Sequence, residues 1–474
     1  MADLVPLLID SDRITTTNTA DVISPWTGQT VHKVCLADAA VIEQTIASSQ
    51  AAFEKTKRQP PHERAELLLR VAAELKARRN DFAALITLES GKPITLAEAE
   101  VDRAIITFTD SAEQARSPFS ETLDAAGYAP GVGQSAIARR FPVGVVLGIG
   151  PFNFPLNLVA HKVAPAIACG ATIVLKPSPR TPAVALKLAE TILACGGTPG
   201  QVNILHCDNA AVHALLDDAR IKVVTFTGSA AVGWQLKAKA VKQKVTLELG
   251  GNAAVIVHAD ADLAAAVPAI ATGAFANAGQ SCISVQRIFA HADIYDEFRD
   301  RLVAYTKENI VTGDPSRRDV LNGPMIDRPT LERAVATAQD AVAAGGYAWC
   351  GGTAEGPCLL PTIIENVPAG HRLVAEEAFA PVAVLSRYGD FEKAIAAVNA
   401  SRYGLQAGVF TRDTSLVAQA FERLDVGGVL INQTPTARLD PLPYGGVKDS
   451  GVGREGPRYA IEDMTELRTL VIKH

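Results

Sequence analysis

One cysteine lies in a setting that suits chemistry, within the segment Gly279-Gln280-Ser281-Cys282-Ile283-Ser284. Small and polar neighbours surround Cys282, and the preceding stretch, 270–278, has a helical pattern. A cysteine acts as a nucleophile when its thiolate is accessible or a base lies nearby. The residue type alone does not decide this, because the chain holds seven cysteines and most single cysteines are inert small hydrophobes.

Two further segments place a carboxyl group and an amide at the ends of predicted strands. Glu248 ends an apolar run before two glycines, where a partly desolvated carboxylate could serve as a general base or could form a surface salt bridge. Asn153 lies in the turn 148–155, whose Gly150 and two prolines fix the backbone. Its amide could stabilise an oxyanion or merely cap the following helix.

Two turns have the composition of phosphate or ribose sites. The turn 226–233 contains Gly228 and Ser229 between a predicted strand and a predicted helix, and a helix N-terminus attracts anions. The GxGxxG fingerprint is absent, so an ordinary strand-to-helix turn is an equal alternative. Lys176, directly after another strand, could bind ribose hydroxyls or phosphate, or could be a solvated lysine.

These segments must be positioned by an alternating α/β framework. Helix-like sequence covers 40–115, and short apolar strands then alternate with helices up to Leu249. Such alternation predicts a doubly wound parallel sheet, which binds ligands at the carboxyl ends of its strands. A second alternating region follows from 252 to about 432. The β-prone tail, 466–472, needs a strand partner, for which a second subunit is one source. The predicted strands of the first region are 143–147, 171–176, 201–205, 222–226 and 245–249, and its predicted helices are 157–169, 182–194, 210–216 and 230–241.

Bulk composition excludes several classes of protein. The 474 residues predict two to four domains. A formal charge of -6 and the absence of a dense basic run argue against nucleic-acid binding. The first ten residues make a poor signal peptide, and no apolar run is long enough for a membrane span. An odd number of cysteines without a CxxC pair fits neither a disulfide framework nor a zinc site, so we expect a cytoplasmic protein without a metal.

Taken together, the chemical segments resemble the aldehyde dehydrogenase superfamily. Their order and spacing match, as do two further segments, 376–382 and 443–451, so the resemblance covers about 20 to 470. It implies the aldehyde dehydrogenase fold, an α/β class with a Rossmann-like cofactor domain, an α/β catalytic domain and a small β oligomerisation flap. The implied bounds are 1–122 and 142–250 for the cofactor domain, 251–442 for the catalytic domain, and 123–141 with 456–474 for the flap. It also implies a homodimer or homotetramer.

The resemblance assigns a role to each of the singled-out residues. Cys282 would attack an aldehyde, Asn153 and the Cys282 backbone N–H would stabilise the oxyanion, and Glu248 would activate the water that hydrolyses the thioester. The cofactor would be NAD or NADP. Its binding residues would be Pro151, Phe152, Lys176, Ser178, Gly228, Ser229, Gly233, Glu377 and Phe379.

Departures from the family pattern concern the cofactor and the substrate. Some NAD-preferring relatives have Glu where this chain has Pro179, and the neighbouring Arg180 could attract a 2′-phosphate. Relatives that bind phosphorylated aldehydes often have Arg where this chain has Ser281. Ser281 and the apolar Phe154, which follows Asn153, both argue against a dianionic substrate.

The substrate itself is only bounded by the sequence. Arg103 and Arg438 are candidate anchors for a carboxylate or hydroxyl group, and structural roles for both are equally open. The chain resembles the lactaldehyde and semialdehyde branches, so we expect a small-molecule aldehyde. Two alternatives are a CoA-acylating relative and a catalytically silent scaffold. The presence of Glu248 favours hydrolysis, and the intact set of Cys282, Glu248, Asn153 and Lys176 argues against silence.

Overall fold

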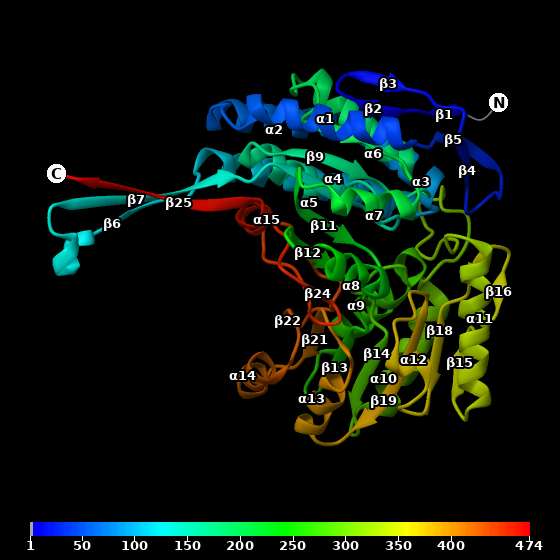
Figure 1. Cartoon of the computed structure of the whole chain (residues 1–474). Helices are drawn as coiled ribbons and strands as arrows, with labels where there is room; N and C mark the ends of the chain where they lie inside the picture. The colour runs from blue at the N-terminus through cyan, green and yellow to red at the C-terminus, as the bar shows by residue number, and fades with distance from the viewer. Residues whose placement is uncertain (1–2) are drawn as a thin grey trace.

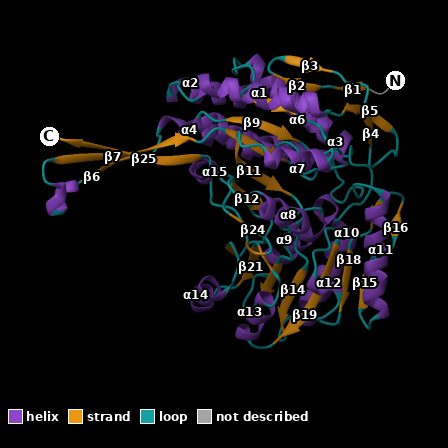
Figure 2. Ribbon diagram, viewed as in Figure 1, coloured by secondary structure: helices purple, strands orange, loops and turns teal. Residues whose placement is uncertain are grey.

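The structure is a computed structural model that describes residues 3–474. Two sheets lie one above the other in Figure 1, and a long β arm projects from the upper one. Helices flank both sheets (Figure 2), so the α/β class predicted from the sequence is confirmed. No helix within the described range is long and apolar enough to cross a membrane.

The upper sheet has eight strands, of which the central five are parallel. In chain order these five strands have the spatial order 3-2-1-4-5, so the order reverses between β8 and β11. Ligands of doubly wound sheets bind at such a reversal, outside the carboxyl ends of the strands. The strands in spatial order are β24 (Gly451–Val452), β12 (Lys244–Glu248), β11 (Ile221–Thr227), β8 (Val145–Ile149), β9 (Thr172–Lys176), β10 (Val202–Ile204), β2 (Leu7–Ile9) and β3 (Asp12–Ile14).

Buried residues of alternating direction fix both faces of this sheet. Val146 and Ile173 point into one apolar cluster, while Leu147 and Val174 point into another on the opposite face. This period of two is what a fully covered parallel sheet requires. The first cluster contains helices α2 (Pro61–Ala77), α3 (Arg79–Ser90), α4 (Ile94–Arg116), α5 (Asn157–Cys169) and α6 (Pro182–Ala194), and the second contains α1 (Ala39–Thr56), α7 (Asn209–Asp217) and α8 (Ala230–Lys239).

The lower sheet has seven strands, with one antiparallel strand, β15, at its edge. Its strand β13 follows β12 of the upper sheet through Gly250 and Gly251, so the two sheets are joined close to Glu248. In spatial order its strands are β15 (Tyr347–Cys350), β18 (Thr362–Glu365), β19 (Val382–Tyr388), β14 (Arg287–His291), β13 (Ala254–Val257), β21 (Gln406–Phe410) and β22 (Gly428–Ile431). Its helices are α9 (Leu263–Phe275), α10 (Tyr295–Asn309), α11 (Arg328–Ala343), α12 (Arg372–Ala375), α13 (Phe391–Asn399) and α14 (Thr414–Arg423).

The projecting arm is a three-stranded antiparallel sheet in the order β25-β7-β6 (Figure 1). The terminal strand β25 (Thr465–Lys473) pairs with β7 (Gln134–Pro142) of the same chain along its nine residues, and β6 (Ser120–Leu123) covers the far edge of β7. The partner that the sequence leaves open is therefore present within the chain. The outer edge of β25 pairs with no strand of the described residues. Four apolar side chains of this strand are exposed: Leu467, Leu470, Val471 and Ile472.

The remaining short elements support the N-terminus and the loops around the site. A small sheet, β1-β5-β4, covers the start of the chain, and helix α15 joins the arm to the upper sheet (Figure 1). These elements are β1 (Asp3–Val5), β4 (Thr19–Ile23), β5 (Thr30–Cys35), β16 (Ala354–Glu355), β17 (Cys358–Leu359), β20 (Tyr403–Gly404), β23 (Val447–Lys448) and α15 (Pro457–Asp463), with short 3-10 helices at 125–127, 129–131 and 276–279.

Candidate active site

The loop that carries Cys282 is shaped by three consecutive residues in the left-handed region. Helix α9 ends at Phe275, not at Ala278 as the sequence pattern predicts, because Asn277, Ala278 and Gly279 have φ values of 54°, 55° and 63°. Such backbone is unfavourable for residues other than glycine and is often found at functional sites. A Cβ on Gly279 would lie 2.2 Å from the carbonyl oxygen of Ala380, so glycine is required for this turn.

Cys282 is half-buried, and its Sγ lies 3.2 Å from the Tyr444 hydroxyl. Burial raises the pKa of the Cys282 thiol to about 12, although the hydrogen bond with Tyr444 and the charge of Arg438 act in the opposite direction. The segment 443–451 matches the family in the sequence, but the match does not by itself identify Tyr444 as a site residue. The signal for it was an aromatic hydroxyl within that matched segment.

Glu248 ends β12 and is 3 % exposed, and neither of its carboxylate oxygens has a hydrogen-bond partner among the described residues. Burial and the nearby Glu455 carboxylate raise the pKa of Glu248 well above its usual value, while Arg438 and Lys162 oppose that rise. A buried carboxyl group without a partner can accept a proton from a bound water, as a general base must. The close approach of Gly445 keeps the surroundings tight, since a Cβ there would lie 2.8 Å from Glu248 Oε1.

Asn153 joins the turn after β8 to the cysteine loop. Its Nδ2 donates to the carbonyl oxygen of Gln280 at 3.0 Å, and the side chain is buried. A side-chain amide has two N–H donors, so one remains for a substrate oxygen. The cap alternative does not hold, because the amides of Leu156 and Asn157 at the start of α5 donate instead to Glu100.

A buried ionic cluster, which the sequence did not predict, lies behind Glu248. The Nζ of Lys162 donates to Glu455 Oε1 at 3.0 Å and to the hydroxyl of Thr227 at 2.7 Å. Arg438 donates to the other oxygen of Glu455 at 3.1 Å. Burial alone would raise the pKa of Glu455, but these two cations more than offset that effect and hold its pKa low. Lys162 lies within an apolar helix and gives no periodic signal for its role.

The four candidate substrate residues make different contacts. Arg103 makes a two-pronged ion pair with Asp440, at 2.8 and 3.0 Å. The guanidinium of Arg438 lies 3.7 Å from the Tyr444 ring centroid, while Phe154 is covered by the ammonium of Lys92 at 3.6 Å. Ser281 is half-buried beside Cys282, and its amide donates to the carbonyl of Gly279.

Two of the candidate cofactor segments follow β9 and β11. Lys176 is largely buried, burial lowers its pKa, and no described carboxylate forms a salt bridge with it. The Ser178 hydroxyl accepts from the amide of Arg180. Ser229 is the N-cap of α8, yet its exposed hydroxyl does not bond to that helix. A Cβ on Gly233 would lie 2.3 Å from Leu249, so this glycine lets α8 pack against the turn after β12.

The other candidate cofactor residues include Glu377, Phe379 and Phe152. Glu377 Oε1 accepts from the amide of Gly251 at 3.0 Å, and burial raises the pKa of Glu377 to about 7. Phe379 has a φ of 47°, and its ring meets that of Phe152 edge-to-face at 5.9 Å. Pro151 directly precedes Phe152 in the same turn. The structure therefore brings the turn after β8 and the segment 376–382, far apart in sequence, into direct contact.

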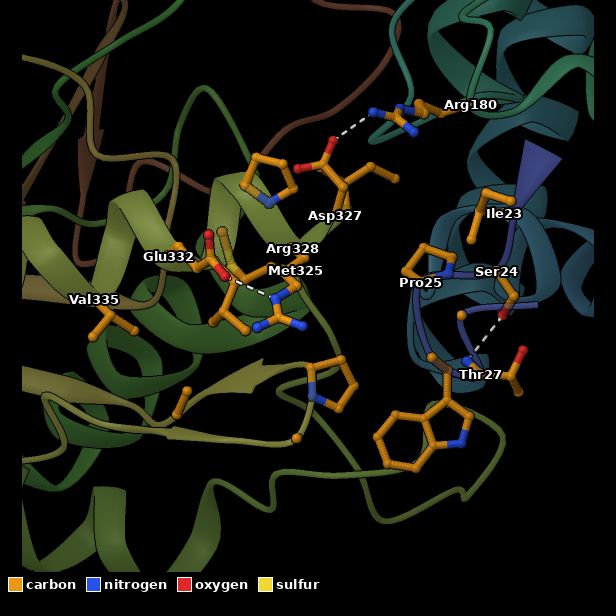
Figure 3. A pocket seen from close by; sticks show the side chains of 18 of the residues that line it. Ile23, Ser24, Pro25, Thr27, Arg180, Met325, Asp327, Arg328, Glu332 and Val335 are labelled. Atoms are coloured by element: carbon orange, nitrogen blue, oxygen red, sulfur yellow. Dashed lines mark hydrogen bonds and ion pairs between the residues drawn. The ribbon is translucent and has the colours of Figure 1, made fainter. Parts of the chain in front are cut away.

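Arg180 is held in an ion pair by Asp327. Its Nη2 lies 2.5 Å from Asp327 Oδ2, at the edge of a cavity of about 910 Å³ that also involves Trp26 and Glu332 (Figure 3). None of the cavity's lining residues belongs to the Cys282 site. A 2′-phosphate that binds Arg180 would therefore have to compete with Asp327 for its guanidinium.

Comparison with known proteins identifies the family of the chain. The model of the aldehyde dehydrogenase family matches residues 13–470. A 3-sulfolactaldehyde dehydrogenase from Priestia megaterium is 40% identical over 467 residues, which cover 98% of this chain and 97% of the relative. A lactaldehyde dehydrogenase from Methanococcus aeolicus is 37% identical, with 95% and 97% covered.

A solved structure gives the same result. Aldehyde dehydrogenase 21 from Physcomitrella patens, solved with the reaction product succinate, has a TM-score of 0.97 and 40% identity, with 100% of this chain and 99% of that chain covered. The predictions of family, of fold and of an enzyme that uses NAD or NADP are confirmed. The chain belongs to the aldehyde dehydrogenase family.

Proposed function

We propose that this chain oxidises a small hydroxy-aldehyde or semialdehyde to the carboxylic acid, through a thiohemiacetal and a thioester on Cys282. The observation that carries the proposal is the convergence of Cys282, Asn153 and Glu248 at the point where the two sheets meet. Asn153 bonds directly to the cysteine loop, and Gly251, just after Glu248, lies against the Cys282 carbonyl.

The residues at the carboxyl ends of the upper sheet fit a dinucleotide. An N-cap hydroxyl that does not bond to its own helix leaves the α8 N-terminus available for a pyrophosphate. The buried ammonium of Lys176, which has no carboxylate partner among the described residues, suits ribose hydroxyls. Pro151, Phe152, Ser178, Gly228, Glu377 and Phe379 complete the proposed binding set. When bound there, NAD or NADP would supply the hydride acceptor that the oxidation needs.

The chain's own side chains perform the remaining steps. The Cys282 thiolate donates a lone pair to the aldehyde carbon, an S–C bond forms, and the carbonyl π pair moves onto oxygen. The free N–H of the Asn153 amide and the Cys282 backbone N–H donate to that oxyanion. Glu248 then takes a proton from water while the water oxygen adds to the thioester carbon. The C–S bond breaks, which returns the thiolate. Because Glu248 lies ready as a base, hydrolysis is favoured over transfer to CoA.

Buried arginine donors near the site support an anionic or hydroxylated substrate. Arg438 shares the carboxylates Glu455 and Asp440 with other cations, and its buried Nε makes no hydrogen bond with a described residue. The other ion pairs nearby are those of Lys92 with Glu100, Arg103 with Asp440 and Lys162 with Glu455. The relatives' names denote aldehydes that carry sulfonate or hydroxyl groups, and the succinate complex shows a carboxylate product.

Three broader predictions belong with this proposal. We propose the domain bounds 1–122 with 142–250, 251–442, and 123–141 with 456–474. We also propose a homodimer or homotetramer that assembles through β25, because a long edge strand with exposed apolar side chains favours pairing with another chain. Seven cysteines without a disulfide support a cytoplasmic location.

The test is an aldehyde panel with NAD and with NADP, read by the absorbance of the reduced cofactor. Lactaldehyde, 3-sulfolactaldehyde and succinic semialdehyde should be turned over with lower KM than the uncharged propionaldehyde. Cys282→Ala should abolish turnover and leave cofactor binding intact. Turnover by Cys282→Ala would overturn the mechanism, and equal KM for all four aldehydes would overturn the substrate class.

A further inference from the structure

Tyr444 lies directly against the sulfur of Cys282. Its hydroxyl oxygen is 3.2 Å from Sγ, and no other described side chain forms a hydrogen bond to that sulfur. Glu248 does not take this position, because neither of its oxygens has a partner. The group that contacts the resting nucleophile is therefore a phenol and not the proposed base.

Both the backbone and the ring of Tyr444 are held in place. The backbone amide of Tyr444 donates to the carbonyl of Glu455 at 3.0 Å, and the amide of Glu455 donates to the carbonyl of Tyr444 at 2.7 Å. The Arg438 guanidinium lies over the ring at 3.7 Å from the centroid, and Ile283 and Leu405 pack around it. Only 5 % of Tyr444 is exposed. A ring fixed in this way can keep its hydroxyl at the sulfur without losing further side-chain entropy during catalysis.

We propose that Tyr444 is a catalytic residue whose phenolic O–H donates a hydrogen bond to the Cys282 thiolate. This inference rests on the proposed function, in which Cys282 is the nucleophile. The thiol first loses its proton to water, and the phenol then donates to the anionic sulfur. When the sulfur lone pair forms the S–C bond and the carbonyl π pair moves onto oxygen, the phenol keeps its proton throughout.

The charges around the sulfur show why such a donor is needed. Glu377 and Glu248 both disfavour a thiolate, and burial disfavours it further, whereas Arg438 and Tyr444 favour it. Burial also raises the pKa of Tyr444 well above its usual value, so its hydroxyl stays protonated and remains a donor. No described histidine forms a hydrogen bond to Sγ, so the partner that activates many catalytic cysteines is replaced here by a phenol.

Removal of this donor has two opposite effects on the thiol. A hydrogen bond to a charged group is worth about 1 to 2 pH units in a thiol titration. Thiolate nucleophilicity rises with basicity by a Brønsted factor of about 0.4–0.5. Burial places the midpoint of the Cys282 thiol at high pH, so Tyr444→Phe should slow alkylation about 3- to 10-fold over the whole range below that midpoint.

The experiment measures alkylation of Cys282 by iodoacetamide from pH 6 upward, followed by peptide mass mapping without cofactor or aldehyde. Tyr403→Phe is the matched control, because Tyr403 is half-buried and makes no hydrogen bond to Cys282. Alkylation of Tyr444→Phe that is slower by this factor, with the Tyr403→Phe profile unchanged, supports the proposal. Superimposable profiles for Tyr444→Phe and the parent protein overturn it. The mechanism as a whole fails separately, if Cys282→Ala retains turnover.

Discussion

The exchange Glu248→Gln separates hydride transfer from thioester hydrolysis. Glutamine keeps the volume of the side chain but cannot accept a proton from water. Because both oxygens of Glu248 are free of hydrogen bonds, the exchange breaks no described contact. We expect one reduced cofactor per active site in a rapid burst, followed by steady-state turnover lower by about 10²–10⁴, the usual contribution of a general base.

The sign of the pH dependence follows from the raised pKa of Glu248. The base is the carboxylate, so hydrolysis increases as pH rises through the Glu248 pKa, which lies above that of a free glutamate. Below that pKa the parent protein also holds a neutral side chain, and its steady-state rate approaches that of Glu248→Gln. The ratio of parent to variant rates should therefore grow with pH and then level off.

Stopped-flow absorbance gives the burst amplitude, and steady-state assays across pH give the ratio. Asp463→Asn is the control, since Asp463 is a second carboxyl group whose pKa burial raises, but it bonds to Thr246 and not to the site. A burst that disappears together with steady-state turnover would refute the assignment, as would a rate ratio that does not change with pH.

Three further predictions address the oxyanion, the buried charges and the arm. Asn153→Ala should lower kcat by about 10²–10³ with cofactor affinity unchanged, and an unaltered kcat would contradict its role. Lys162→Met leaves the buried Glu455 carboxylate with one cation fewer and should lower the free energy of unfolding by about 3–5 kcal/mol. Arg328→Ala, which breaks an exposed ion pair, should not lower it. Equal midpoints of thermal unfolding for the two variants would contradict this. Leu470→Glu on β25 should reduce the mass measured by light scattering, and an unchanged mass would argue against assembly through this edge.

The sequence specifies elements well where burial and punctuation agree. Helices over 157–169 and 182–194 are observed with the predicted bounds, because Gly170 adopts a left-handed cap after the first and Pro182 begins the second. The first strand was predicted at 143–147 and lies at 145–149, since a buried apolar run does not show where its pairing begins. Helix α9 stops early because the turn 277–279 depends on contacts with 321 and 380, which no local pattern contains.

The site was predictable where family motifs carry it and not where tertiary contacts create it. Cys282, Glu248 and Asn153 stand in recognisable segments, whereas Tyr444 acquires its contact only through folding. The contacts of Arg103 and Arg438 likewise arise only through folding. Their residue type suggested anchors, but the structure shows both engaged with Asp440 or Glu455, so any anchoring of substrate must use the donors that these ion pairs leave free.

The charges behind Glu248 explain how one carboxyl group becomes a base while its neighbour stays ionised. Glu248 and Glu455 repel each other, so a shared environment would raise the pKa of both. Of the two carboxyl groups, only Glu455 accepts hydrogen bonds from Lys162 and Arg438, and these cations hold its pKa low. The ionised Glu455 then raises the pKa of Glu248, which has no bonded cation of its own. The direct contacts of Lys162 and Arg438 therefore decide which carboxyl group of the pair has the raised pKa and can act as the base.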